Sequence, residues 1–140
     1  PLAHDELGLL PTYYVMEAGK TMPETVIAEM PEESCKWLTD AELAIYCREY
    51  GRTGFQGGLN WYRARLAGVD TVKRRPIRVP TTFISGERDW GVYQSPGSFE
   101  SMQMNLGKTL RGVHFVEGAG HWVQQEESEI TSKLILESIA

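Results

Sequence analysis

The second half of the chain alternates between strand-like and helix-like segments, and this alternation constrains the fold more than any other feature. Residues 77–85 are rich in β-branched residues and are followed by Gly86, as expected of a buried strand. Because Pro80 cannot donate a hydrogen bond to a sheet, we expect the strand to begin at Thr81. A second strand is predicted at Val113–Val116. Strands that alternate with helices favour parallel pairing in an α/β sheet.

A helix is predicted after each of these strands. Ser98–Leu106 places its apolar residues on one face, and Glu126–Ile139 carries an apolar stripe. We therefore interpret residues 76–140 as part of an α/β core. Parallel sheets need both faces covered, which two strands do not achieve alone, and the chain begins without a methionine. Both observations favour the C-terminal portion of a longer protein, with the earlier strands upstream.

Residues 1–75 lack this alternation and predict a layer of helices and loops. Thr39 and Glu42 have the spacing of a capping box, in which each side chain binds the free backbone N–H of the other residue. We expect the helix that they open to run from about Asp40 to Tyr50. Gly51 is expected to stop it, because glycine commonly follows the last turn of a helix.

Several glycines follow this helix. We expect Gly54, Gly57 and Gly58 to form a flexible approach to a second helix. Earlier in the chain, Pro23 occupies a position where proline is favoured in the first turn, so a short helix is predicted to begin near Met22. The apolar residues of the second helix are Leu59, Trp61, Tyr62 and Leu66.

The composition argues against several classes of protein. With 140 residues, 41% hydrophobic and 24% charged, the chain resembles one ordinary globular domain. A net charge of −5 argues against a nucleic-acid partner, and the basic cluster of Lys73, Arg74, Arg75 and Arg78 is interpreted as a solvated linker. No stretch approaches the ~18 apolar residues of a membrane span, and the first residues do not resemble a secretory signal. We expect a cytoplasmic protein that binds neither nucleic acid nor membranes.

Cysteine content leads to the same expectation. Cys35 and Cys47 are too few for a disulfide scaffold or a closed zinc site. We interpret both as reduced thiols, which is the usual state of cysteine in the cytosol. No metal site is expected.

An acid and a histidine follow the two predicted strands. Asp89 lies in the loop directly after the first strand, and His121 follows the second strand behind the small residues 118–120. Because ligands in open α/β sheets collect at the carboxyl ends of strands, two neighbouring parallel strands would present these side chains together. A carboxylate beside a histidine fixes its tautomer and stabilises the imidazolium that forms when it takes a proton. The order of acid and histidine matches that of α/β-hydrolases.

Each residue also has a structural interpretation. Asp89 could serve only as a turn former or helix cap, and His121 could serve only in packing. Of the other histidines, His114 lies within a predicted strand and His4 lies in the first few residues. We therefore regard neither of those two as a catalytic candidate.

Three motifs resemble those of soluble epoxide hydrolases, which are α/β-hydrolases with a helical lid. Residues 54–63 are similar to the lid signature with its Asn-Trp-Tyr-Arg run. Residues 83–90 resemble the acid-bearing loop of that family, and residues 118–126 resemble its histidine loop. The resemblance implies most of a helical lid at 1–75 and the last two strands of an α/β-hydrolase core at 76–140. Haloalkane and haloacetate dehalogenases share this core.

The resemblance also implies roles for three residues. Asp89 would orient His121, and His121 would activate water. Tyr62 would protonate or hydrogen-bond the epoxide oxygen as the ring opens, a role that suits a phenol because the leaving oxygen needs a donor at neutral pH. The substrate would be a small apolar molecule such as an epoxide, and no cofactor is implied because carboxylates, imidazole, phenol and water suffice.

Other aromatic residues are candidates for the substrate pocket. The family normally uses a second lid tyrosine, for which Tyr13 and Tyr14 are candidates, although ordinary packing is the favoured interpretation of both. Tyr62 could likewise be an aromatic anchor beside its neighbour in the helix. The remaining pocket candidates are Trp61, Trp90 and Trp122.

The chain departs from the family in its nucleophile. The attacking aspartate of the family lies on a strand-to-helix turn, and none of Asp5, Asp40, Asp70 and Asp89 is expected on such a turn. The resemblance therefore implies that this chain does not form the covalent ester by itself and that a complementing N-terminal half supplies the nucleophile. Two other functions stay open: non-catalytic binding of a small molecule or a partner, and dehalogenase-type hydrolysis.

Overall fold

The computed structural model describes residues 10–31, 35–68 and 75–140. These residues form two compact units: the first combines residues 10–31 with residues 77–140, and the second contains residues 35–68 and 75–76. His4, Asp5, Asp70, Lys73 and Arg74 lie outside the described residues. The assignment of residues 1–75 to a lid and 76–140 to a core stays a prediction.

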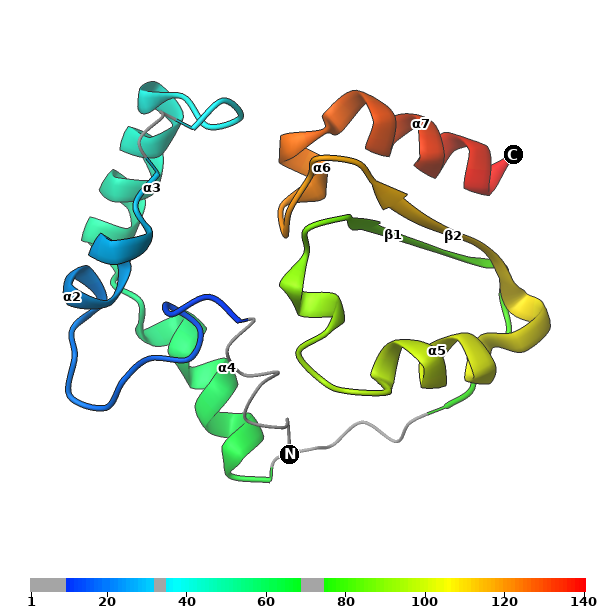
Figure 1. The fold of residues 1–140 in the computed structure, drawn as a ribbon, viewed down its shortest axis with the longest axis horizontal. Helices are drawn as coiled ribbons and strands as arrows, with labels where there is room; N and C mark the ends of the chain where they lie inside the picture. The colour runs from blue at the N-terminus through cyan, green and yellow to red at the C-terminus, as the bar shows by residue number, and fades with distance from the viewer. Residues whose placement is uncertain (1–9, 32–34, 69–74) are drawn as a thin grey trace. The chain divides into compact units, whose positions relative to one another are not determined.

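A two-stranded parallel sheet lies at the centre of the first unit (Figure 1). Strand β1 spans Thr81–Gly86 and strand β2 spans Leu110–Val116. The start of β1 at Thr81 and the parallel pairing confirm the sequence-based predictions. Strand β2 begins three residues before the predicted Val113, because Leu110 already pairs with Thr81 at the start of the ladder.

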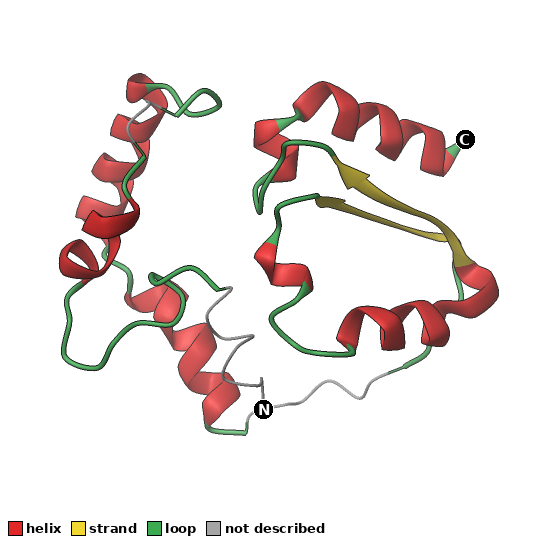
Figure 2. Ribbon diagram, viewed as in Figure 1, coloured by secondary structure: helices red, strands yellow, loops and turns green. Residues whose placement is uncertain are grey.

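The connection between the strands is helical, as Figure 2 shows. It contains the 3₁₀ turn η2 (Trp90–Val92), helix α5 (Ser98–Leu106), which has the predicted bounds, and the 3₁₀ turn η3 (Gly107–Thr109). Helix α5 covers one face of the sheet through three phenylalanines. The ring centroid of Phe99 lies 5.2 Å from that of Phe83 and 5.6 Å from that of Phe115.

The opposite face of the sheet packs against the C-terminal helix α7 (Ser128–Ile139). Side chains alternate along each strand, so Ile84 points away from the face that carries Phe83. Ile84 and Leu134 pack against the buried cluster of Val116, Ala119 and Val123. Because Val116 ends β2 and Ala119 belongs to the loop that follows it, this cluster supports the candidate site.

The predicted helix over 126–139 is observed as α7, which begins two residues later and ends at the predicted Ile139. Helix α6 (Val123–Glu126) is a single turn, and Glu127 then takes a non-helical conformation with φ −134° and ψ 62° before α7 begins. The break allows the buried hydroxyl of Thr131 to donate a hydrogen bond to the carbonyl of Val123 at 3.1 Å. The prediction is therefore confirmed except for its first two residues, since Glu126 belongs to α6 and Glu127 is non-helical.

The second unit consists of two helices, α3 (Asp40–Thr53) and α4 (Gln56–Leu66). The capping box of Thr39 and Glu42 is confirmed: the Glu42 carboxylate accepts hydrogen bonds from the N–H and the hydroxyl of Thr39. Helix α3 continues past Gly51, which was predicted to stop it. The actual end is Gly54, with a φ of +67°, where Tyr50 stacks on Phe55 across the turn.

The glycines at the start of α4 were also interpreted incorrectly. Gly57 and Gly58 lie in the first turn of α4 rather than in a flexible approach to it. Both have open space around the position of a Cβ atom, so nothing in their surroundings requires glycine. Each glycine destabilises the helix by only about 1 kcal/mol relative to alanine, and the other residues of α4 outweigh this cost.

Residues 10–31 form a short capped segment of the first unit. Helix α2 (Met22–Val26) has its proline in the first turn, as predicted, and is followed by the 3₁₀ turn η1 (Ile27–Glu29). Thr21 and Glu24 form a second capping box.

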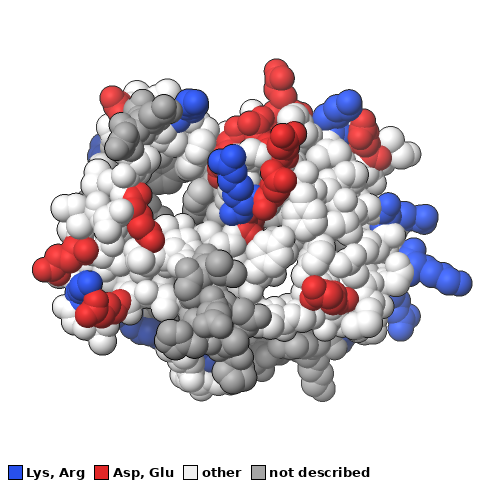
Figure 3. Space-filling model, in the orientation of Figure 1, with Lys and Arg blue, Asp and Glu red and all other residues white. Residues whose placement is uncertain are grey.

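Within the described ranges, no helix is long and apolar enough to cross a membrane. Acidic and basic side chains both occur on the face drawn in Figure 3.

Candidate active site

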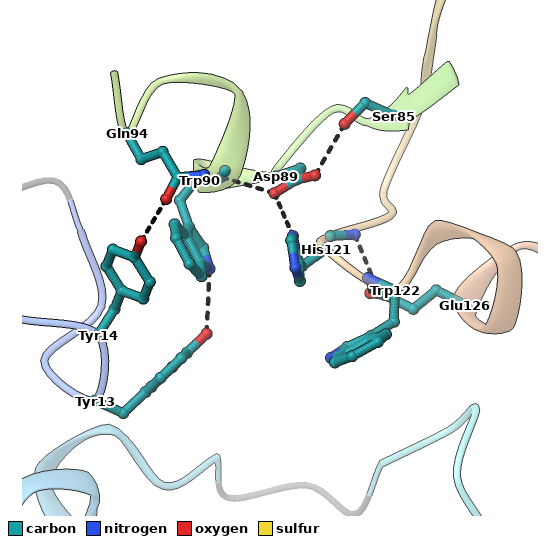
Figure 4. Close-up of polar contacts among 11 residues, drawn as sticks. Tyr13, Tyr14, Ser85, Asp89, Trp90, Gln94, His121, Trp122 and Glu126 are labelled. Carbon is teal, nitrogen blue, oxygen red and sulfur yellow. Dashed lines mark hydrogen bonds and ion pairs between the residues drawn. The ribbon is translucent and has the colours of Figure 1, made fainter. Parts of the chain in front are cut away.

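The loops after the two strands bring Asp89 and His121 together at the carboxyl end of the sheet (Figure 4). The Nδ1–H of His121 donates a hydrogen bond of 2.8 Å to Oδ1 of Asp89. Asp89 is largely covered, with 13% of its side chain exposed, whereas His121 is 45% exposed. The contact fixes the hydrogen on Nδ1 and leaves Nε2, on the other side of the ring, able to take a proton from water.

The carboxylate of Asp89 is held by its own loop. Asp89 is the N-cap of η2, and its Oδ1 accepts a hydrogen bond of 2.7 Å from the N–H of Gly91. Its Oδ2 accepts a bond of 3.0 Å from the hydroxyl of Ser85, which is buried near the end of β1. Capping, one of the two interpretations considered for Asp89, is therefore real, and it holds the carboxylate where it meets His121.

The two strand-end loops touch through their backbones. The N–H of Arg88 donates to the carbonyl of Ala119, and the N–H of Glu87 donates to the carbonyl of Val116, both at 2.9 Å. A Cβ atom at position 86 would lie 2.2 Å from the carbonyl oxygen of Gly120. Only glycine at position 86 permits this approach, and the approach sets the separation of the acid and the histidine.

Aromatic rings surround His121. The indole of Trp90 is nearly parallel to the imidazole, with centroids 5.2 Å apart and an interplanar angle of 19°. Trp122 meets the imidazole edge-on at 5.4 Å. The indole N–H of Trp90 donates to the hydroxyl of Tyr13, and Tyr14 packs against the same indole with centroids 4.2 Å apart. Four of the predicted pocket residues, Tyr13, Tyr14, Trp90 and Trp122, are thus linked to His121 directly or through Trp90.

Trp61 and Tyr62 belong to the other compact unit, where both lie on α4. They are 75% and 61% exposed, respectively. Their side chains therefore remain available to a ligand, but their part in the site stays a prediction.

A concave surface lies beside Trp90 in the first unit. It has a volume of about 320 Å³ and is lined by Leu10, Trp90, Val92, Tyr93, Phe99, Glu100 and the loop residues 95–97. The lining is mostly apolar, which suits a small apolar molecule. Within the described part of the chain, no group of three or more His, Cys, Asp or Glu side chains is arranged to hold a metal ion.

Three residues of the site were not singled out from the sequence: Ser85, Gly91 and Glu126. Ser85 and Gly91 supply hydrogen bonds to Asp89, and Glu126 accepts hydrogen bonds from the backbone on both sides of His121. Their proximity in the chain to Asp89 and His121 was a usable signal. What they contact was not readable, because each interaction depends on the conformation of a loop.

Comparison with known proteins places this chain beside epoxide hydrolases. It is 32% identical over 114 residues to epoxide hydrolase B of Mycobacterium tuberculosis, covering 76% of this chain and 31% of that protein. It is 35% identical over 116 residues to epoxide hydrolase 1 of Siraitia grosvenorii, covering 78% of this chain and 37% of that protein. The chain thus spans about a third of the length of these curated relatives.

A solved structure extends the likeness to the fold. The structure of epoxide hydrolase I of potato, Solanum tuberosum, matches with a TM-score of 0.67 and 31% identity, covering 96% of this chain and 44% of that one. No family model matches the chain. The likeness therefore rests on individual relatives and on a structure that agree with one another.

Proposed function

Because this chain belongs to the epoxide-hydrolase-like members of the α/β-hydrolase superfamily, we propose that it supplies the histidine and its acid to an enzyme that opens epoxides to diols. The observation that carries the proposal is the 2.8 Å hydrogen bond between His121 and Asp89 at the ends of two parallel strands. The substrate is a small apolar epoxide, and the chemistry proceeds through an ester of an aspartate supplied by a complementing N-terminal half.

In this proposal the first step is ring opening. A carboxylate oxygen of the nucleophile forms a bond to an epoxide carbon, and the bond from that carbon to the epoxide oxygen breaks. The oxygen takes a proton from the phenol of Tyr62, which becomes a phenolate. The exposed position of Tyr62 on α4 is compatible with contact to a ligand. The product of this step is a hydroxyalkyl ester.

The second step is ester hydrolysis. Nε2 of His121 takes a proton from water, the resulting hydroxide adds to the ester carbonyl, and the intermediate expels the diol oxygen. That oxygen receives the proton from His121, and the proton of the released carboxylic acid restores the phenol of Tyr62. Asp89 stabilises the imidazolium that exists between these transfers, because its carboxylate accepts the Nδ1–H of the ring at 2.8 Å.

The test uses the polypeptide as its own gene encodes it, with styrene oxide and a haloalkane as parallel substrates. His121→Ala should accumulate the covalent ester, detected as a mass increase, because removal of a general base slows its step by about 10²–10⁴-fold. Hydrolysis of the ester at the wild-type rate would refute the role of His121. Turnover of the haloalkane in place of the epoxide would favour dehalogenase chemistry.

Tyr62 is tested separately. Tyr62→Phe should slow ring opening more than ester hydrolysis, because only the first step uses the phenol as a proton donor. Tyr50→Phe is the matched control, since it removes a phenol from α3 and keeps the ring that stacks on Phe55. Equal slowing of both steps in Tyr62→Phe would indicate a packing role.

We further propose that the protein is cytoplasmic and that the complementing half remains associated with this chain. Cell fractionation followed by affinity purification tests both statements together. Recovery of this chain in the soluble cytoplasmic fraction, with an N-terminal half on the same polypeptide or on a partner, is the expected result. Recovery from another compartment would contradict the proposed location.

A further inference from the structure

Glu126 is the last residue of the single-turn helix α6, and its half-buried carboxylate turns back onto the histidine loop (Figure 4). Its Oε2 accepts a hydrogen bond of 2.7 Å from the backbone N–H of Gly120. Its Oε1 accepts a bond of 2.9 Å from the backbone N–H of Trp122. These two N–H groups belong to the residues on either side of His121. We propose that Glu126 is a positioning residue that clamps the backbone around His121.

The histidine loop needs such a restraint. It contains Gly118, which has a φ of +75°, and Gly120, so its backbone is intrinsically permissive. The side chain of His121 is 45% exposed, and packing therefore covers only part of it. The hydrogen bond between Nδ1 and Asp89 fixes one edge of the ring. The position of Nε2 also depends on the backbone of His121, which must therefore be held as well. Two charge-assisted hydrogen bonds supply this restraint, and each is stronger than a bond between neutral groups.

A carboxylate suits the clamp better than any other side chain of this size. Both of its oxygens are acceptors, whereas the amide of glutamine offers one acceptor and one donor, and a donor would face an N–H. A Cβ atom at position 120 would lie 3.2 Å and 3.3 Å from the two oxygens of Glu126. Glycine at position 120 therefore leaves the space that the carboxylate occupies.

The base of the clamp is itself anchored. Thr131 is buried in the first turns of α7, and its hydroxyl donates to the carbonyl of Val123 in α6. Val123 belongs to the buried cluster against which Ile84 and Leu134 pack. Helix α6 is thus held to the core through Val123, and Glu126 at its end holds the histidine loop.

The consequence for the chemistry rests on the proposed function. Glu126 contacts neither the imidazole nor a reacting atom in the described structure; it acts through the backbone at Gly120 and Trp122. Its loss should therefore impair ester hydrolysis, which uses His121, more than ring opening, which does not. A residue that merely supports folding would lower the amount of active protein and slow both steps equally.

The test compares Glu126→Gln with Glu129→Gln in the polypeptide as its own gene encodes it. Glu129 lies exposed in the first turn of α7, so its replacement removes the same charge without touching the loop. In Glu126→Gln, amide hydrogen exchange at Gly120 or Trp122 should accelerate about tenfold, and the downfield Nδ1 proton of His121 should broaden. Ester hydrolysis should fall about tenfold to hundredfold, the range expected for a catalytic group misplaced by up to about 1 Å. Glu129→Gln should change none of these.

Several outcomes would overturn the inference. One is unchanged exchange at both amides in Glu126→Gln, and another is equal slowing of both chemical steps. Glu126→Asp keeps the charge on a shorter side chain that does not reach both N–H groups; wild-type behaviour of this variant would show that charge alone suffices. If Glu126→Gln does not fold, rapid exchange of both amides in the wild-type protein would refute the clamp. Absence of any epoxide turnover in the wild type would refute the proposed function, while the exchange and imidazole measurements would still test the clamp.

Discussion

Replacement of Gly86 by alanine should force apart the two loops that carry Asp89 and His121. The added Cβ would lie 2.2 Å and 2.4 Å from the carbonyl oxygens of Gly120 and Ala119. All of the nearest atoms are backbone, so no side chain can rotate away. Real Cβ atoms essentially never approach other atoms within 3.0 Å, and the loop after β2 must therefore retreat by at least about 0.8 Å.

The size of the effect follows from this displacement. Overpacking of this kind costs about 1–3 kcal/mol of unfolding free energy. The hydrogen bond from Arg88 to the carbonyl of Ala119 is stretched by the same movement, which adds about 1 kcal/mol. We therefore expect Gly86→Ala to lose about 2–4 kcal/mol. If the retreat is transmitted in full, the 2.8 Å contact between His121 and Asp89 lengthens to about 3.6 Å, which is beyond a hydrogen bond.

Urea unfolding measures the loss of unfolding free energy. The downfield imidazole proton of His121 in an NMR spectrum reports whether the hydrogen bond to Asp89 is kept. Gly58→Ala is the matched control, because the same substitution there meets open space on α4 and should stabilise the helix by about 0.5–1 kcal/mol. An unchanged urea midpoint together with an unchanged imidazole proton in Gly86→Ala would refute the close approach of the two loops.

Three further predictions follow from the hydrogen bonds of the described residues. Ser85→Ala removes a buried hydroxyl that donates to Asp89, and it should lower the unfolding free energy measured in urea by about 1–2 kcal/mol. Ser138→Ala, which removes an exposed hydroxyl of α7, is the control. An effect of Ser85→Ala no larger than that of the control would contradict the prediction. Thr39→Ala should weaken α3 by about 1 kcal/mol, measured as lost helical signal in circular dichroism. Hydrogen bonds from the side chain and backbone of Thr39 lower the pKa of Glu42 below its usual 4.5, so this stabilisation is present above pH 4.5 and is lost as the pH falls through the lowered pKa. The acid-induced loss of helical signal should be smaller in Thr39→Ala, which keeps only the backbone donor; an identical acid titration would argue against the capping box.

The sequence was most informative where structure depends on neighbours in the chain. Helix α5 and the start of β1 at Thr81 were predicted at the observed residues, since apolar spacing, β-branched content and the missing N–H of Pro80 all act locally. The capping box of α3 was likewise readable. The errors at Gly51 and Gly58 arose because a glycine costs a helix about 1 kcal/mol, and the remaining residues of α3 and α4 outweigh that cost.

The candidate site divides in the same way. The sequence by itself determined that an acid and a histidine follow two strands that would lie side by side, because strand order and loop position follow from local pattern and from parallel pairing. Only the tertiary structure decided that the loops meet closely enough for a 2.8 Å contact, which depends on the space at Gly86. It also decided that the last helix begins at Ser128, after the non-helical Glu127. The contacts of the Glu126 carboxylate with the backbone on both sides of His121 likewise depend on the conformation of the histidine loop, which periodicity does not encode.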